Sequence, residues 1–145
     1  MRSIFIWLVL CVSELAHGQV MLVSEAEARS SRAAPILTAR AVPVPDAPAI
    51  EIVSPDLKEA ITSPTKVELR FRPVAPATVK PESFRALYGA FRIDITSRLR
   101  EFAKVTPEGL VLEHATLPTG AHRIFMEVQD STGRVGAQLL SVTVR

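Results

Sequence analysis

Three histidines and a single cysteine are the side chains of this 145-residue chain best suited to bind a transition metal or to catalyse a reaction. Their positions (His17, His114, His122 and Cys11) give no His-x-x-x-His pair and no cysteine pair, and no Asp-x-Asp-x-Asp run is present. The sequence also lacks Gly-x-Ser-x-Gly, the motif that exposes a nucleophilic serine on a tight turn. We therefore expect no metal site, no other cofactor and no enzymatic activity.

The remaining candidates for acid–base chemistry lie at positions that predict structural roles. His122 has the same strand parity as the apolar Ile124, so we expect a histidine at the rim of the core, hydrogen-bonded to backbone. Asp130 precedes Gly133 by three residues, and a carboxylate in such a turn accepts backbone N–H groups. Asp94, two residues before a threonine, predicts similar hydrogen bonding at the end of a strand.

One group of side chains is better suited to recognition than to chemistry. Arg123, Phe125 and Glu127 share the predicted outward face of a strand, and Leu139 lies on the outward face of the next strand. Two interpretations stay open. A loop, the N-terminal segment or Ser97–Lys104 could cover these side chains, or they could be scattered exposed residues, which are normal. Alternatively, the four residues form a partner-binding strip, because interfaces favour arginine and aromatic side chains.

The elements that would position these residues are strands with a period of two. Over Lys66–Arg72, Val67, Leu69 and Phe71 share one face while charged residues share the other. The two closing strands run to Asp130 and from Val135 to Val144, joined by an Asp-x-x-Gly turn. Their predicted inward residues are Ile124, Met126, Val128, Leu140, Val142 and Val144.

The middle of the chain combines strands with one helical segment. A strand or pair covers Ser83–Thr96, with a turn near Gly89 and with Phe91, Ile93 and Ile95 on one face. Helical spacing over 97–104 predicts a short helix capped by the side chain of residue 96 or 97, and Thr106-Pro-Glu-Gly109 predicts a turn. Short strands divided by Gly and Pro turns, without a long helix, predict an all-β antiparallel sandwich of about seven strands over residues 48–145.

The N-terminus has the layout of a secretory signal peptide. Arg2 precedes an apolar run from Ile4 to Val12, and a polar, small-residue segment ends at Gly18. The apolar run is well short of the ~20 residues that span a bilayer. We expect cleavage after residue 18, with an uncleaved anchor as the alternative, and therefore a periplasmic or extracellular protein without a stable membrane span. Residues 19–47, rich in Ala and Pro, predict a disordered tether.

Composition argues against a nucleic-acid-binding protein and against a fold stabilised by disulfides. The chain has 17 Lys and Arg against 15 Asp and Glu, a net charge of +2, with both signs interspersed. Nucleic-acid binding requires a clustered positive face, so we do not expect it. Cleavage would remove Cys11, the only cysteine, and would leave no disulfide to support the fold. Stability must then come from an apolar core.

Three motifs resemble bacterial immunoglobulin-like domains. They are Pro48-x-Ile-x-Ile-x-Ser-Pro55, the alternating strand from Val67, and Leu117-Pro-x-Gly-x-His-x-Ile followed by Val128-x-Asp-x-x-Gly133. The resemblance covers roughly residues 48 to 145 and implies an immunoglobulin-like sandwich. Arg134 stands where the family often has asparagine. Because such domains serve as spacers, adhesive modules and accessory domains, the resemblance implies a non-catalytic module that contacts a protein or a cell-envelope component.

A copper-handling protein is the alternative function. Periplasmic copper-binding proteins of the CopC type are also small β-sandwiches, and they use the amino group and imidazole of an N-terminal histidine. Cleavage after Ala16 would place His17 at that position. That cleavage would place Glu14 at position −3, which disfavours it, and a long segment separates His17 from the predicted sandwich. A mature chain that starts at Gln19 or later would exclude this alternative.

Overall fold

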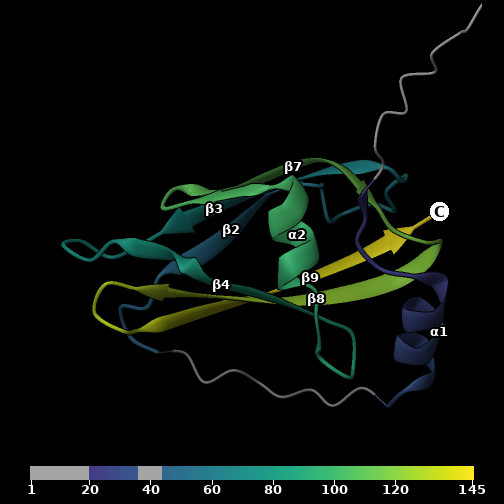
Figure 1. Cartoon of the computed structure of the whole chain (residues 1–145), viewed down its shortest axis with the longest axis horizontal. Helices are drawn as coiled ribbons and strands as arrows, with labels where there is room; N and C mark the ends of the chain where they lie inside the picture. Colours follow the sequence, from purple (N-terminus) through teal and green to yellow (C-terminus); the bar gives the residue numbers. More distant parts are fainter. Residues whose placement is uncertain (1–19, 36–43) are drawn as a thin grey trace, which may run out of the picture.

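The alternating segments form two stacked sheets in the computed structural model, which describes residues 20–35 and 44–145 (Figure 1). The elements, in chain order, are β1 (Val20–Met21), α1 (Glu25–Ala33), β2 (Ala49–Ser54), β3 (Thr65–Arg72), β4 (Val79–Tyr88), β5 (Ile93–Asp94), α2 (Thr96–Phe102), β6 (Lys104–Thr106), β7 (Gly109–Thr116), β8 (Gly120–Asp130) and β9 (Val135–Val144). The predicted all-β sandwich is confirmed.

The chain changes sheet several times. The first sheet has the order β1-β7-β3-β2, with β6 also paired to β7, and the second has the order β5-β4-β8-β9. Because β2, β3 and β7 share one sheet while β4, β8 and β9 share the other, the topology is consistent with an immunoglobulin-like sandwich. The described residues contain nine strands, three of them only two or three residues long, where the sequence predicted about seven.

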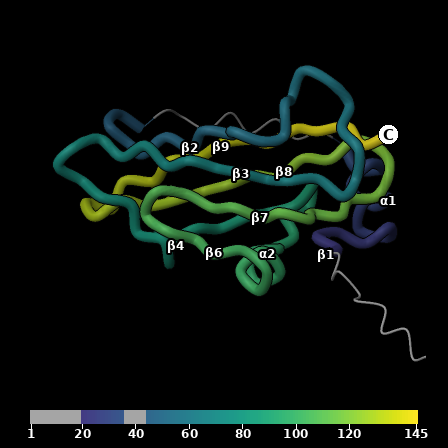
Figure 2. Tube along the Cα trace, turned by 90° about the horizontal axis from the view of Figure 1, so that it is seen from above, coloured from purple at the N-terminus to yellow at the C-terminus, as the bar shows by residue number. Residues whose placement is uncertain are grey.

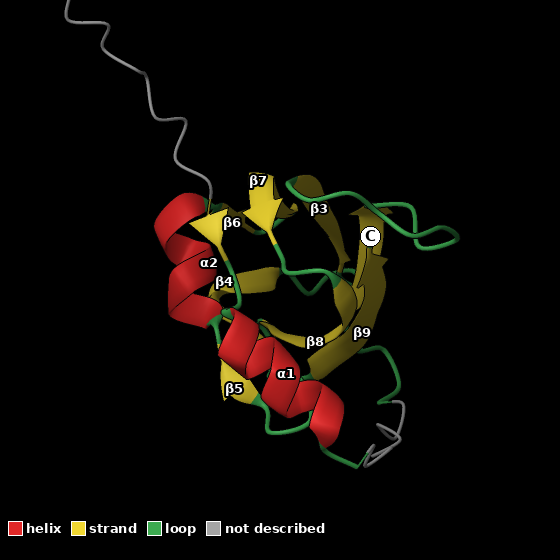
Figure 3. Ribbon diagram, turned by 90° about the vertical axis from the view of Figure 1, so that its right-hand side faces the viewer, coloured by secondary structure: helices red, strands yellow, loops and turns green. Residues whose placement is uncertain are grey.

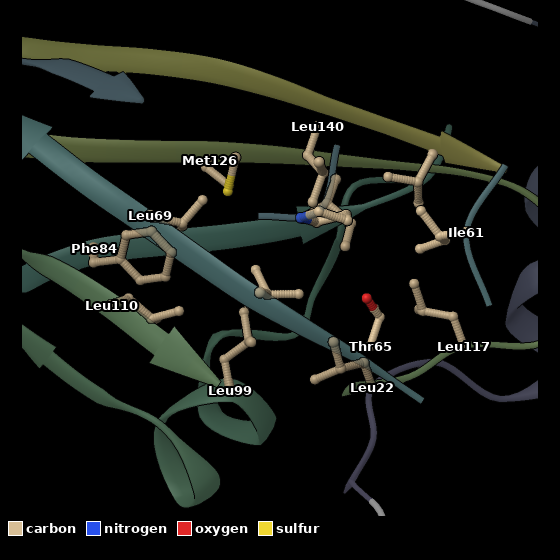
Figure 4. A pocket seen from close by; sticks show the side chains of 14 residues that line it. Leu22, Ile61, Thr65, Leu69, Phe84, Leu99, Leu110, Leu117, Met126 and Leu140 are labelled. Carbon is tan, nitrogen blue, oxygen red and sulfur yellow. The ribbon is translucent and has the colours of Figure 1, made fainter. Parts of the chain in front are cut away.

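The core lies between the two sheets, where the sequence places it. The predicted inward residues of β3, β8 and β9 are all buried. They leave an apolar internal cavity of about 20 Å³, around which Leu22, Leu99 and Leu117 converge with side chains of both sheets (Figure 4). A cavity of this size has room for about one water molecule and none for an organic ligand.

The region between β4 and α2 departs from the prediction. Phe91, expected on the same face as Ile93 and Ile95, is 64% exposed, whereas Ile95 is fully buried. The strand stops at Tyr88, and a turn with positive φ at Gly89 and Arg92 breaks the alternation before β5. The predicted helix is confirmed as α2, beside β6 in Figure 2. Its cap differs from the prediction, because no side chain of residue 96 or 97 caps it.

The predicted tether over 19–47 is wrong for residues 20–35, which we call the N-terminal arm. The arm pairs β1 in parallel with β7 and buries Leu22, Val23 and Ala28 in the sandwich. Ser24 and Glu27 form a capping box at the start of α1, which crosses the end of the sandwich near α2 (Figure 3). Residues 1–19, with the predicted signal peptide and His17, and residues 36–43 lie outside the described residues. None of the helices within the described ranges has the length and apolar character needed to cross a bilayer.

Candidate partner-binding face

An apolar row crosses the outer face of the second sheet. Leu87 on β4 pairs with Phe125 on β8, which in turn pairs with Leu139 on β9. Leu87 is buried, with 9% of its surface exposed, Phe125 is half-buried and Leu139 is 40% exposed. The guanidinium of Arg92 lies 3.9 Å from the centre of the Phe125 ring, in a cation–π contact. The row therefore crosses three neighbouring strands, and its exposed apolar surface lies on β8 and β9.

The four residues of the predicted strip are brought together on this face. Phe125 and Leu139 are direct cross-strand partners, Arg123 is exposed one position along the same face of β8, and Glu127 is half-buried on the other side of Phe125. The cover that we considered as an alternative is supplied in part by Arg92, whose guanidinium lies over the Phe125 ring. Sequence reasoning missed Arg92 and Leu87, because their positions over and beside Phe125 depend on a turn with positive φ and on the β4–β8 register.

A cleft adjoins the row where the N-terminal arm meets the second sheet. Its volume is about 380 Å³, and its walls are the last turn of α1, the turn after β4 and the outward residues of β8 and β9. Arg123 and Phe125 of the predicted strip line it, whereas Glu127 and Leu139 do not. The other lining residues are Ser31, Arg32, Ala34, Gly89, Ala90, Ala121, His122, Ser141, Val142 and Thr143.

Two glycines provide the surface on which the end of α1 lies. Gly89 has φ +67° and Gly120 has φ +125°, both in the left-handed region that favours glycine. A Cβ atom at Gly89 would collide with the Ser31 side chain, and one at Gly120 would collide with the Arg32 guanidinium. Ala90 N–H donates to the Ser31 hydroxyl over 3.2 Å. These contacts fix one wall of the cleft against the sheet.

An ion pair attaches the other end of α1 to the sandwich. The Arg98 guanidinium donates two hydrogen bonds to the Glu27 carboxylate, of 2.8 and 2.9 Å, and a third of 3.1 Å to the Leu22 carbonyl. These hydrogen bonds from Arg98, together with the backbone N–H of Ser24, lower the pKa of Glu27 to about 2. The negative charge of Glu27 therefore contributes to the attachment of the arm.

The floor of the cleft contains a buried histidine. His122 is 2% exposed, with Nδ1 2.7 Å from the Tyr88 hydroxyl and Nε2 2.6 Å from the Pro118 carbonyl. A carbonyl can only accept, so Nε2 carries the proton, and Nδ1 accepts from the tyrosine. Burial lowers the pKa of His122, which keeps the ring neutral. The predicted hydrogen bond to backbone is confirmed, although the residue is buried and not at the rim.

The other predicted structural carboxylates are also confirmed. Asp130 is fully buried, and its Oδ1 accepts from the N–H groups of Thr132, at 2.9 Å, and Arg134, at 3.0 Å. Burial alone would raise the pKa of Asp130, but the hydrogen bonds from Thr132 and Arg134 lower it to about 2. Asp94 accepts from Thr96 N–H at 2.9 Å and thereby orders the start of α2.

Residues 20–35 and 44–145 contain no group of three or more His, Cys, Asp or Glu side chains placed to share a metal ion. No protein-family model matches the chain, and no curated protein is similar to it. Among solved structures, the chain is similar to CopC from Methylosinus trichosporium OB3b, with 22% identity over 66% of this chain and 92% of that chain and a TM-score of 0.43. A similarity of this level identifies neither a ligand nor a function for the chain.

Proposed function

We propose that this chain is an exported, non-catalytic module that binds a protein of the periplasm or the cell exterior through the outer face of its second sheet. The observation that carries the proposal is the apolar row of Leu87, Phe125 and Leu139, which is continuous across three strands. Phe125 lies at the centre of this row with Arg92 over its ring, and aromatic and arginine side chains are enriched at protein interfaces. The signal-like sequence of residues 1–18 supports export.

The buried polar groups support a structural module without chemistry. His122 uses both ring nitrogens in hydrogen bonds inside the fold, and Asp130 uses both carboxylate oxygens. A general base must have a lone pair available to a substrate proton. The one lone pair of the neutral His122 ring already accepts from Tyr88, and the Asp130 carboxylate is fully buried, where a substrate proton does not reach it. Their hydrogen bonds therefore hold the turn after β8 and the floor of the cleft.

Replacing Phe125 tests the proposal. The purified protein is used to capture partners from envelope extracts, and the captured proteins are identified and compared with those of Phe125→Ser. We expect the variant to lose the partner while its melting temperature stays close to that of the wild type. Val111→Ser is the matched control, because Val111 is exposed on β7 of the first sheet. Equal capture by all three proteins would show that the second sheet is not the binding face.

Export has a separate test. N-terminal sequencing of the secreted product should give a start near Gln19. Retention of residues 1–18 would favour the anchor, and a start at His17 would restore the copper alternative.

A further inference from the structure

The cleft beside the apolar row carries an excess of positive charge. Arg32 lines it from α1 and Arg123 lines it from β8, and no aspartate or glutamate is among the described residues of its wall. The end of α1 contributes a partial negative charge of about half a unit, which two full positive charges exceed. Glu25 is near enough to influence His122 but does not line the cleft. The local field therefore attracts an anion.

Both guanidinium groups retain hydrogen-bonding capacity. Arg32 donates from Nη1 to the Thr119 carbonyl over 3.1 Å, which accounts for one of the five N–H groups of an arginine side chain. With respect to the residues described, the Arg123 side chain makes neither a hydrogen bond nor an ion pair. Arginine is the side chain whose planar fork best matches a carboxylate. The free N–H groups thus suit an oxyanion.

The remaining wall determines what else the ligand carries. Ala34, Ala90, Ala121 and Phe125 supply apolar surface, and Ser141 supplies a hydroxyl group. A volume of about 380 Å³ is at the lower end of the range of about 300–1,000 Å³ typical of small-molecule sites. We propose that the cleft binds a small organic acid, with its carboxylate on Arg32 and Arg123 and its apolar part against Phe125. This site does not depend on the protein partner proposed above.

An NMR titration of the purified protein with benzoate tests the site. We expect saturable shifts at the amides of Arg123 and Phe125, and an affinity that falls as salt is added. Benzamide, the neutral analogue, should cause no saturable shift. Arg123→Gln should weaken benzoate binding about tenfold or more, as the loss of a charge-assisted hydrogen bond does. Arg85→Gln is the matched control, because Arg85 is on β4 outside the cleft and pairs with Asp94.

A second variant blocks the site without removing an arginine. Ser141 is the cross-strand partner of Arg123, so Ser141→Glu should pair with that guanidinium and abolish benzoate binding, whereas Ser141→Gln should retain it. Three results would overturn the proposal: no saturation with benzoate, equal binding of benzamide, or an unchanged affinity in Arg123→Gln. Tighter binding of phenyl phosphate would exclude a carboxylate as the preferred group. Tighter binding of a glutamate-rich peptide would exclude a small acid as the ligand.

Discussion

A substitution at Leu22 tests whether the N-terminal arm packs as part of the folded domain. Its side chain is 1% exposed and lines the internal cavity with Leu99 and Leu117 (Figure 4). Leu22→Ala would enlarge a cavity that already exists, and such a change in a packed core costs about 2–5 kcal/mol in free energy of unfolding. At about 3–5 °C per kcal/mol for a domain of this size, the melting temperature should fall by about 6–25 °C.

The neighbouring residue provides the control. Met21 is in the same short strand but is 65% exposed, so Met21→Ala should change the free energy of unfolding by less than about 0.5 kcal/mol. Urea denaturation of the two variants and the wild type gives both values, and limited proteolysis shows whether the arm detaches before the sandwich unfolds. If Leu22→Ala is as stable as Met21→Ala, the arm does not pack as described, and the tether predicted from the sequence is correct.

Three further predictions concern the contacts that hold the arm and the cleft. Glu27→Gln should lower the free energy of unfolding by about 1–2 kcal/mol at pH 7. This is the value for a charged hydrogen bond, reduced because Arg98 is partly exposed. In a double-mutant cycle, Arg98→Gln should add little to the effect of Glu27→Gln. Because the pKa of Glu27 is lowered to about 2, this stabilisation is present above about pH 4.5 and is lost as the pH falls towards 2. If the free energy of unfolding of Glu27→Gln falls with pH as steeply as that of the wild type, this prediction is wrong. The pKa of His122 is lowered by burial, so protons bind preferentially to the unfolded chain, and stability should fall as the pH drops below about 6.5. Melting curves at pH 7.5 and 5 should therefore differ more for the wild type than for His122→Gln, and equal differences would argue against a neutral buried ring. Gly120→Ala should lower the free energy of unfolding by about 1 kcal/mol more than Gly133→Ala does. Both glycines have positive φ, but only a Cβ at Gly120 displaces Arg32. Equal losses of free energy in urea denaturation would mean that Arg32 does not lie on Gly120.

Part of the candidate site could be predicted from residue patterns and part could not. The outward parity of Arg123 and Phe125 follows from the alternation within one strand, so these two of the residues that line the cleft were predicted to face outward. Arg32 was missed, because it is 91 positions away from Arg123 and reaches the cleft only through the docking of α1 on two glycines. The capping box at Ser24 and Glu27 was a usable signal for α1, since it marks the start of a helix in a segment otherwise interpreted as disordered.

The sequence alone determined the two-layer β-sandwich, the inward side chains of β3, β8 and β9, and the structural roles of His122 and Asp130. These features depend on residues a few positions apart, and a strand with period two places them on one face wherever it packs. The tertiary structure alone decided that the N-terminal arm packs, that Leu87 joins Phe125 in one row, and that two arginines share a cleft. Those contacts join segments remote in the chain, and their stability depends on burial and register, which no local pattern contains.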